Sequence, residues 1–451
     1  SSDVCSSDLL GPPVALIVQK YGGSSVSDVE AIKRVAKRIV ETRNAGHKLV
    51  VVVSAMGDTT DELLDTAAQI TDNAPEREMD ILLTAGERIS MSLLSMAINE
   101  LGVPAQAFTG AQAGIHTTSA YGRAQITGMV PERIARSISE GQVAIVAGFQ
   151  GISDDDDVTT LGRGGSDTTA VALAAALHAD VCEIYTDVDG LFSADPRIVP
   201  KAHRLRSIST EETLELAAHG AKILHLRAVE FARRYKVPLH VRSSFSEKEG
   251  TWISDRPASP ALKGLVPDAA FLDPKEGKME QPIISGIAHD RGQDKITVAG
   301  VPNHPGRAAM VFQTIAAAGA NIDMIVQNIP VADPTRANIT FTIPEADAQV
   351  ALDALESAKE EIGFKEVRYN PNIGKLSLVG TGMRTNPGVA ARLFAALSEA
   401  GINIDLISSS EIRLSIVTKL DDLDRAVAVV HSAFGLDAEV SEAVVYAGTG
   451  R

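Results

Sequence analysis

Residues 14–25 read VALIVQKYGGSS. The apolar start of this segment, residues 14–18, is typical of a buried strand, and the glycines predict a tight turn. A helix is expected next, because capping residues and then apolar residues at helical spacing follow. Backbone N–H groups at such a turn converge on an anion, and Lys20 adds a positive charge. The segment is a candidate phosphate site without the P-loop pattern, although a turn with a solvated lysine explains it equally well.

Length and composition are those of a globular protein with several domains. The 451 residues allow roughly two to four domains. A net charge of −16 argues against nonspecific binding to nucleic acid or anionic membranes. The sequence contains no run of about 18 consecutive apolar residues, so no membrane span is expected.

The cysteines and the first residues bear on location. Cys5 and Cys182 leave no disulfide framework, so we expect a reducing, cytoplasmic location. Residues 1–13 lack the basic and apolar regions of a signal peptide. We expect them to be a non-native or disordered leader.

Buried-strand patterns alternate with helical patterns from residue 14 to residue 246. This alternation, with continuously apolar strands, predicts one domain with a doubly wound, mostly parallel α/β sheet. From residue 247 to residue 282, proline, glycine, serine and charged residues predict a linker. The predicted strands are residues 14–18, 49–54, 105–108, 143–147, 181–186 and 239–242.

The remainder of the chain contains a duplication. Residues 321–323, Asn-Ile-Asp, recur 82 residues later at 403–405. Each copy predicts the strand and helix order βαββαβ of a ferredoxin-like unit. The copies are assigned to residues 283–365 and 366–451, and a strand near residues 283–289 is a candidate partner for the second copy.

Six motifs, in one order, carry a resemblance to a known family. They are KYGGSS from Lys20, SAMG from Ser54, TAGERIS from Thr84, GFQG from Gly148, TLGRGGSDTT from Thr160 and YTDVDGLFSADPR from Tyr185. Together they resemble the bacterial aspartate kinases, in which an amino-acid kinase domain precedes two ACT domains. The resemblance covers residues 14–451. It implies phosphorylation of the side-chain carboxylate of L-aspartate by ATP, the first step of lysine, threonine and methionine biosynthesis.

Two charged side chains suit an amino-acid substrate. Arg163 lies in a glycine-rich turn before an alanine-rich helix, and its planar fork matches a carboxylate or phosphate. Glu87, taken alone, is more simply a solvated or ion-paired glutamate. The resemblance places both in the aspartate site, where Glu87 suits the ammonium group and Arg163 the α-carboxylate. The candidate substrate-binding residues are Ser25, Thr60, Glu87, Arg163, Gly164, Gly165 and Ser166.

The resemblance also implies the nucleotide site and the chemistry. Because the attacking carboxylate is already ionised at neutral pH, no general base is required, and catalysis depends on positioning and charge stabilisation. ATP is expected to carry Mg²⁺ on its phosphate oxygens and water. The candidate catalytic residues are Lys20, Arg163 and Asp187. The candidate ATP-binding residues are Lys20, Tyr21, Gly22, Gly23, Ser54, Thr186, Asp187, Phe192, Arg197 and Lys222.

No metal site made of side chains is predicted. The acidic run at residues 154–157 is interpreted as a solvated loop tip, and the histidines lack ligand spacing.

The duplicated part implies regulation. In the family, paired ACT domains bind lysine, threonine or both at interfaces between subunits and shift the population of domain arrangements, which implies a homo-oligomer, either dimer or tetramer. Asn303 departs from the family pattern, where an aspartate is common, and cannot pair as a charge with an effector ammonium. The candidate effector residues are Asn303, Gly306, Ala308, Asn321, Ile322, Asp323 and Gln327 in the first copy and Val389, Ala390, Asn403, Ile404, Ser410 and Glu411 in the second.

Two other functions stay open. The chain could be an amino-acid kinase that phosphorylates glutamate, acetylglutamate, carbamate or UMP, although the Glu87 and Arg163 pair disfavours it. It could also be a non-catalytic amino-acid sensor, against which the motifs around Lys20 and Arg163 argue.

Overall fold

The computed structural model describes residues 14–221, 223–262, 284–384 and 386–439, without the side chain of Arg384. The expected leader and most of the predicted linker lie outside these residues. The described chain divides into two compact units. The first contains residues 14–196, 200–262 and 438–439, and the second contains residues 197–199 and 284–437.

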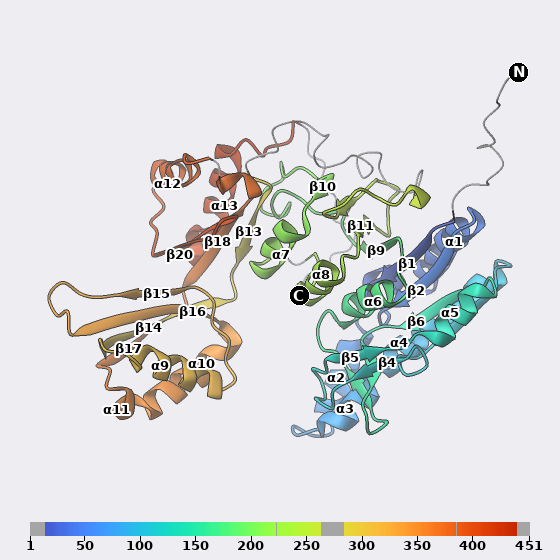
Figure 1. The fold of residues 1–451 in the computed structure, drawn as a ribbon, viewed down its shortest axis with the longest axis horizontal. Helices are drawn as coiled ribbons and strands as arrows, with labels where there is room; N and C mark the ends of the chain where they lie inside the picture. Colours follow the sequence, from blue (N-terminus) through green and yellow to red (C-terminus); the bar gives the residue numbers. More distant parts are fainter. Residues whose placement is uncertain (1–13, 222, 263–283, 385, 440–451) are drawn as a thin grey trace, which may run out of the picture. The chain divides into compact units, whose positions relative to one another are not determined.

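The first unit is built on an eight-stranded sheet in the order β10-β12-β11-β9-β1-β2-β6-β3 (Figure 1). Neighbouring strands run parallel except β11 and β12. This confirms the prediction of a mostly parallel sheet. The strands are β1 (Leu16–Tyr21), β2 (Lys48–Val53), β3 (Ala105–Phe108), β6 (Val143–Ala147), β9 (Val181–Thr186), β10 (Ser207–Ile208), β11 (Leu239–Ser243) and β12 (Thr251–Ile253).

All six predicted strands are present, three with the predicted bounds. The short strands β10 and β12 were not predicted. β12 lies within the stretch assigned to the linker, yet its Trp252 is buried in the core of the first unit. A tryptophan among proline, glycine and charged residues was the available signal that the sheet continues there.

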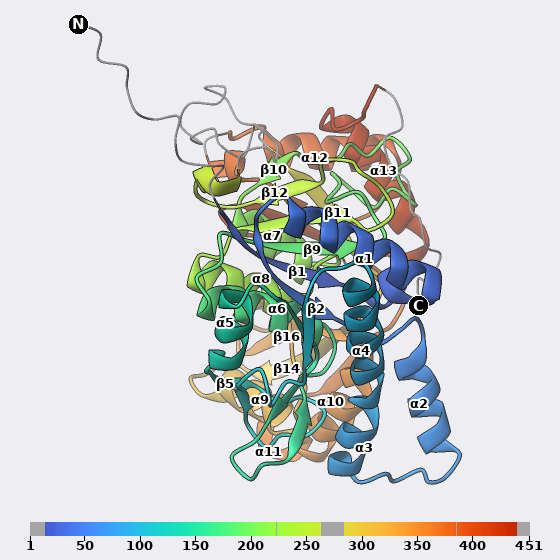
Figure 2. The same ribbon diagram turned by 90° about the vertical axis from the view of Figure 1, so that its right-hand side faces the viewer.

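Helices cover both faces of this sheet. In the two views, α1 and α4 lie on one face, while α5, α6 and α8 lie on the other (Figures 1 and 2). Ile32 and Leu94 from the first pair of helices enter the same core as Val51 and Ile145 of the strands. The helices are α1 (Val29–Asn44), α2 (Thr59–Ala68), α3 (Glu76–Leu83), α4 (Ala85–Glu100), α5 (Glu132–Ser139), α6 (Gly165–Ala176), α7 (Thr210–Ala218) and α8 (Leu226–Tyr235).

The stretch Glu76–Glu100, which contains α3 and α4, is long and apolar enough by composition to cross a membrane. Its side chains argue for a core helix instead. Met91, Leu94 and Ile98 pack in the core, and the charged Asp80 and Glu87 are buried beside the cavity described below.

A small second sheet, in the order β5-β4-β7-β8, lies in the same unit. Its strands have three or four residues each, which is too short to show an alternating pattern, and none was predicted. The last of them leads directly to the glycine-rich turn before α6. The strands are β4 (Ile115–Thr117), β5 (Ile126–Met129), β7 (Gln150–Ile152) and β8 (Val158–Thr160).

The second unit contains two four-stranded antiparallel sheets, β15-β16-β14-β17 and β13-β18-β20-β19. The strands are β13 (Gly286–Asp290), β14 (Gln293–Pro302), β15 (Ile325–Asn328), β16 (Arg336–Pro344), β17 (Glu366–Asn370), β18 (Ile373–Val379), β19 (Leu406–Ser409) and β20 (Arg413–Lys419). The helices are α9 (Arg307–Ala317), α10 (Glu345–Ser357) and α11 (Lys359–Ile362) in the first copy and α12 (Val389–Glu399) and α13 (Leu423–Ala433) in the second.

The sheet boundaries differ from the predicted division at residues 365 and 366. β17 pairs with β14 and so belongs to the first copy. β13 precedes the first copy but pairs with β18 of the second. The first copy is therefore inserted between two parts of the second, and β13 takes the edge position that β17 takes in the first.

Equivalent ion pairs join the two copies. Lys295 of the first copy contacts Asp405 of the second, with Nζ and Oδ2 2.7 Å apart. Lys375 of the second copy contacts Asp323 of the first in the same way. Between the copies, Met324 packs in one apolar cluster with second-copy residues such as Leu406. The two copies thus contact each other through equivalent residues, as their repeated sequences suggest.

Candidate active site

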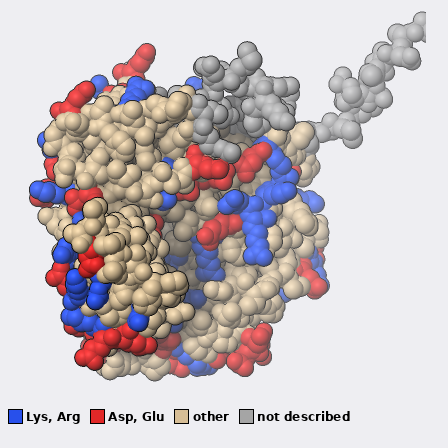
Figure 3. Space-filling view, turned by 60° about the vertical axis from the view of Figure 1, so that its left-hand side comes forward, with Lys and Arg blue, Asp and Glu red and all other residues tan. Residues whose placement is uncertain are grey.

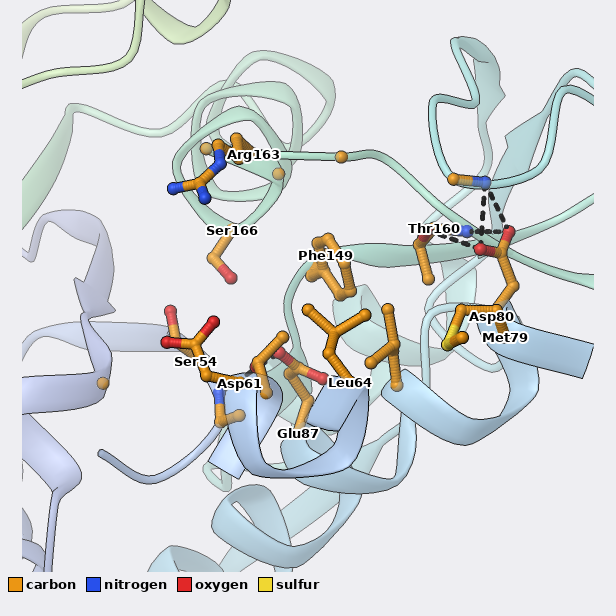
Figure 4. Close-up of a pocket in the computed structure, with 18 of the residues that line it drawn as sticks. Ser54, Asp61, Leu64, Met79, Asp80, Glu87, Phe149, Thr160, Arg163 and Ser166 are labelled. Carbon is orange, nitrogen blue, oxygen red and sulfur yellow. Dashed lines mark hydrogen bonds between the residues drawn. The ribbon is translucent and has the colours of Figure 1, made fainter. Parts of the chain in front are cut away.

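A cavity of about 650 Å³ opens at the carboxyl end of the main sheet of the first unit, where α/β sheets commonly bind ligands. Arg163 and Ser166 approach it from the start of α6, while Ser54, Asp61 and Glu87 lie on the opposite side (Figure 4). Nine of the predicted residues line it. They are Lys20, Gly23, Ser54, Thr60, Glu87, Arg163, Gly164, Gly165 and Ser166.

Lys20 lies near the end of β1 and pairs with Asp167 in the first turn of α6. Its Nζ is 2.6 Å from Oδ1 of Asp167, and the two side chains are 13% and 12% exposed. The turn after Lys20 leaves little room for a side chain, because a Cβ on Gly23 would lie 3.0 Å from the carbonyl oxygens of Ala55 and Gly57. The ion pair with Asp167 holds the ammonium in place at the edge of the cavity.

The N-terminus of α6 faces the same cavity. Gly164 adopts a left-handed φ of 70°, and a Cβ there would lie 2.0 Å from the ring of His225, so only glycine fits. Gly165 begins a twelve-residue helix whose first N–H groups and dipole favour an anion. With Lys20 beside it, this part of the cavity suits phosphate.

Glu87 provides an acidic group in the same cavity, opposite in charge to Lys20. It lies in the first turn of α4 and is 3% exposed. The backbone N–H of Ala55 donates to Oε1 at 3.2 Å, while Oε2 has no hydrogen-bond partner among the described residues. Burial raises the pKa of Glu87 to about 7. A buried carboxylate oxygen without a partner is complementary to an ammonium group.

Two predicted residues lie in the core instead of the cavity lining. Tyr21 is fully buried and stacks on Tyr185, with ring centroids 4.6 Å apart. Burial raises the pKa of Tyr21 well above its usual value. Ser25 is also buried, and its hydroxyl bonds to that of Ser244 at 2.8 Å. Alternation along β1 explains Tyr21, because its side chain and that of Lys20 point to opposite faces.

The predicted nucleotide residues at the end of β9 and beyond it do not line this cavity. Thr186 donates from Oγ1 to Oδ1 of Asp187 at 3.0 Å, and Phe192 is buried. Arg197 falls in the second unit. Lys222 lies outside the described residues. Gly22 is adjacent to the cavity, since a Cβ there would lie 3.4 Å from Nζ of Lys20.

Sequence reasoning missed several lining residues, of which Asp167 and Asp80 are the most consequential. Asp167 stands inside the GRGGSDTT motif, so its position next to the predicted Ser166 was the available signal. Asp80 follows Glu76 and Glu78 in the charged first part of α3, so the sequence offered no signal that sets it apart. Further lining residues that were not predicted include Asp61, Leu64, Met79, Tyr121 and Phe149.

The acidic run at residues 154–157 is only partly a solvated tip. Its first three residues are exposed, but Asp157 accepts hydrogen bonds from Arg77 and from the hydroxyl of Tyr121.

On the face drawn in Figure 3, acidic and basic side chains are interspersed among uncharged surface.

The predicted effector residues of the second unit lie in loops, at helix starts and in or beside strands. Asn303 donates from Nδ2 to the carbonyl of Pro334 at 3.0 Å, and the N–H of Asn321 bonds to Asp347. The two copies are not equivalent here, because Gly306 has a left-handed φ of 95° and Gly388 a φ of −82°. The start of α9 contains Gly306 and Ala308, and the start of α12 contains Val389 and Ala390. The residues in or beside β15 are Ile322 and Gln327. Those beside β19 and β20 are Asn403, Ile404, Ser410 and Glu411.

Family models match both units. A model described as the amino acid kinase family matches residues 15–243, and one described as the ACT domain matches residues 296–358 and 376–434. A relative from Mycolicibacterium smegmatis, named aspartokinase, is 57% identical over 439 residues, covering 97% of this chain and 100% of the relative.

Solved structures agree with these matches. E. coli aspartokinase III in complex with aspartate and ADP (R-state) has a TM-score of 0.76 at 25% identity, covering 93% of this chain and 99% of that one. The same enzyme in complex with lysine and aspartate (T-state) has a TM-score of 0.67 at the same identity and coverage. The high identity over nearly the whole length, together with the two matched domain types, shows that the chain belongs to the amino acid kinase family and, within it, to the aspartokinases.

Proposed function

We propose that this aspartokinase transfers the γ-phosphoryl group of ATP to the side-chain carboxylate of L-aspartate within the cavity that contains Lys20. The products would be 4-phospho-L-aspartate and ADP, which opens the synthesis of lysine, threonine and methionine. The observation that carries the proposal is the unpaired Oε2 of Glu87 in a cavity that Arg163 also lines. One buried anion and two cations around a single cavity are complementary to an acidic amino acid and a phosphate together.

In the proposed complex, the α-ammonium of aspartate donates to Glu87. This contact supplies the missing partner of Oε2 and stabilises the ionised form of the carboxylate. Arg163 binds the α-carboxylate through its planar fork. The hydroxyls of Thr60 and Ser166 are further donors on the cavity lining. The side-chain carboxylate of aspartate is then free to face the phosphate part of the cavity.

Lys20 and the N-terminus of α6 are proposed to stabilise the charge of the transferred phosphoryl group. Asp167 holds the ammonium of Lys20 at 2.6 Å, so the cation is oriented before the nucleotide binds. Fixed donors of this kind lower the barrier because they need no reorganisation during the reaction. The carboxylate nucleophile needs no proton removed, so no residue is assigned as a general base.

ATP is proposed to bind as its Mg²⁺ complex. Among the described residues, no group of three His, Cys, Asp or Glu side chains is arranged to hold a metal ion. Mg²⁺ commonly uses one or two carboxylates together with phosphate oxygens and water. Asp167, beside Lys20 at the cavity edge, fits that donor set. The bound ion would neutralise phosphate charge.

Hydroxylamine trapping tests the reaction directly. Acyl phosphates react with hydroxylamine to give hydroxamates, so the protein with Mg-ATP and a panel of acids reports which carboxylate is phosphorylated. We expect hydroxamate from L-aspartate and little from glutamate or acetylglutamate. Absence of aspartyl hydroxamate would contradict the proposal.

The second unit is proposed to regulate this reaction in a cytoplasmic homo-oligomer that lysine, threonine or both inhibit. Its support is the pair of ACT domains and the likeness to E. coli aspartokinase III in complex with lysine and aspartate. The hydroxamate assay repeated with each amino acid tests regulation, and an unchanged rate with both would contradict it. Sedimentation with and without each amino acid tests the assembly.

A further inference from the structure

Two backbone segments form the wall of the cavity next to Arg163. One is the turn at residues 121–124 between β4 and β5, and the other is the segment 160–163 that leads from β8 towards α6. They contact each other closely. The N–H of Ala124 donates to the carbonyl of Thr160 at 2.9 Å. A Cβ on Gly162 would lie 3.0 Å from the carbonyl oxygen of Gly122.

Asp80 holds both segments from one side. It lies on α3, is 1% exposed, and each of its carboxylate oxygens accepts two hydrogen bonds (Figure 4). Gly122 N–H donates at 2.9 and 3.1 Å, Thr160 N–H at 2.8 Å and Thr160 Oγ1 at 2.7 Å. These bonds to a charged acceptor are stronger than bonds between neutral groups.

Arg227 holds the same two segments through their carbonyl groups. From α8, its Nη1 donates to the carbonyl of Leu161 at 3.0 Å, and its Nη2 donates to that of Ala124 at 3.1 Å. A carboxylate therefore binds N–H groups and a guanidinium binds carbonyl groups of one small wall. The segment 160–163 of this wall ends at Arg163, directly after Gly162.

We propose that Asp80 and Arg227 are positioning residues that fix Arg163 for the carboxylate it binds. The inference rests on the proposed function, in which Arg163 binds the α-carboxylate of aspartate. Both residues act within two or three positions of Arg163 along the chain, at Thr160 and Leu161. Lys20 lies on β1 and has no hydrogen bond to this wall among the described contacts, so loosening the wall should impair aspartate binding more than ATP binding.

The test is a comparison of the KM values for aspartate and ATP in Asp80→Asn, Arg227→Gln and the double variant. Each single variant is expected to raise the KM for aspartate about tenfold, as for the loss of one or two such bonds, while the KM for ATP changes less than about twofold. Because both residues hold one wall, the double variant should show less than the product of the single effects.

Exposed residues on the same helices provide matched controls. Glu78→Gln on α3 and Arg233→Gln on α8 remove the same charges from side chains that are 59% and 55% exposed. Both KM values should stay unchanged in these controls. Thr160→Ser retains a hydroxyl donor for Asp80, whereas Thr160→Val removes it, so the valine variant alone should raise the KM for aspartate. This pair decides the question if Asp80→Asn does not fold.

Equal changes in the two KM values, fully multiplicative effects in the double variant, or identical behaviour of Thr160→Ser and Thr160→Val would overturn the positioning role. Failure of the proposed function is distinguishable from this outcome, because the unaltered protein would then give no aspartyl hydroxamate at all.

Discussion

Two buried charged side chains, Glu87 in the first unit and Lys375 in the second, differ in whether the protein supplies a partner for the charge. Glu87 is 3% exposed, and one of its oxygens has no partner among the described residues. Lys375 is 1% exposed and forms an ion pair with Asp323 of the other copy. An unpaired buried charge is costly and is retained where a ligand supplies the partner, whereas a paired one holds structure together.

The same contrast applies to the other charges of each site. In the catalytic unit, Lys20 is held by Asp167 at the edge of an open cavity. In the second unit, the pairs Lys375 with Asp323 and Lys295 with Asp405 join the two copies. Changes in the first group should therefore affect activity, and changes in the second should affect stability.

The largest expected effect is that of Lys20→Ala on turnover. Removal of the cation that is proposed to contact the phosphates should lower kcat by on the order of a hundredfold or more, while the circular dichroism spectrum stays that of the folded protein. Lys33→Ala, an exposed lysine of α1, is the matched control and should keep full activity. Near-normal turnover of Lys20→Ala at saturating ATP would remove Lys20 from the catalytic site.

The second prediction concerns the two ion pairs that join the copies, Lys375 with Asp323 and Lys295 with Asp405. Asp323→Ala should destabilise the second unit by about 2 kcal/mol, because it leaves the buried ammonium of Lys375 without this partner. Asp405→Ala should cost less than about 1 kcal/mol, because its partner Lys295 is 20% exposed. Denaturant unfolding of the full chain, followed for both variants, measures the difference, and equal losses would show that the pairs are equivalent.

A third prediction concerns substrate affinity. Glu87→Gln should raise the KM for aspartate about tenfold, since a neutral amide replaces a charged acceptor for the ammonium. The KM for ATP should stay within about twofold of the original value. Glu100→Gln, an exposed glutamate at the end of the same helix, is the control. A parallel rise in both KM values would indicate a general disturbance of the cavity.

The strands of the main sheet could be predicted from the sequence better than the short strands of the small sheet and the pairing of distant strands. Long apolar strands such as residues 143–147 were predictable because burial on both faces leaves a continuous pattern. The strands of the small sheet have three or four residues and contain polar residues or glycine in place of a continuous apolar run, so the small sheet was missed. The pairing of β17 with β14 of the first copy depends on long-range contacts, which no local pattern encodes. The strand near residues 283–289, by contrast, was named as a candidate partner of the second copy, and β13 pairs there with β18.

The candidate site was predicted in part for similar reasons. Motif resemblance gave Lys20, Glu87 and Arg163, which the structure brings to one cavity. It also gave Tyr21, whose side chain is in the core because neighbouring residues of a strand face opposite ways. Asp80 was missed because its partners are backbone groups of distant segments, which sequence spacing does not reveal.

The fourth prediction follows from the pKa of Glu87, which burial raises from 4.5 to about 7. In the free protein this carboxyl group binds a proton more tightly than in the unfolded chain. Its contribution to stability is therefore complete below pH 4.5 and is lost as the pH rises through 7. Aspartate, whose ammonium favours the ionised carboxylate, should restore that loss, so thermal stabilisation by aspartate should grow between about pH 6 and pH 8.

The most direct test of the central claim is the dissociation constant of L-aspartate, measured by calorimetry between about pH 6 and pH 8 for the unaltered protein and for Glu87→Gln. If the ionised carboxylate of Glu87 binds the ammonium group of aspartate, the unaltered protein should bind aspartate more weakly as the pH falls through 7, because Glu87 becomes protonated. The Glu87→Gln variant should bind aspartate weakly at every pH in this range. The same pH dependence in both proteins would contradict the assignment of Glu87 to the substrate.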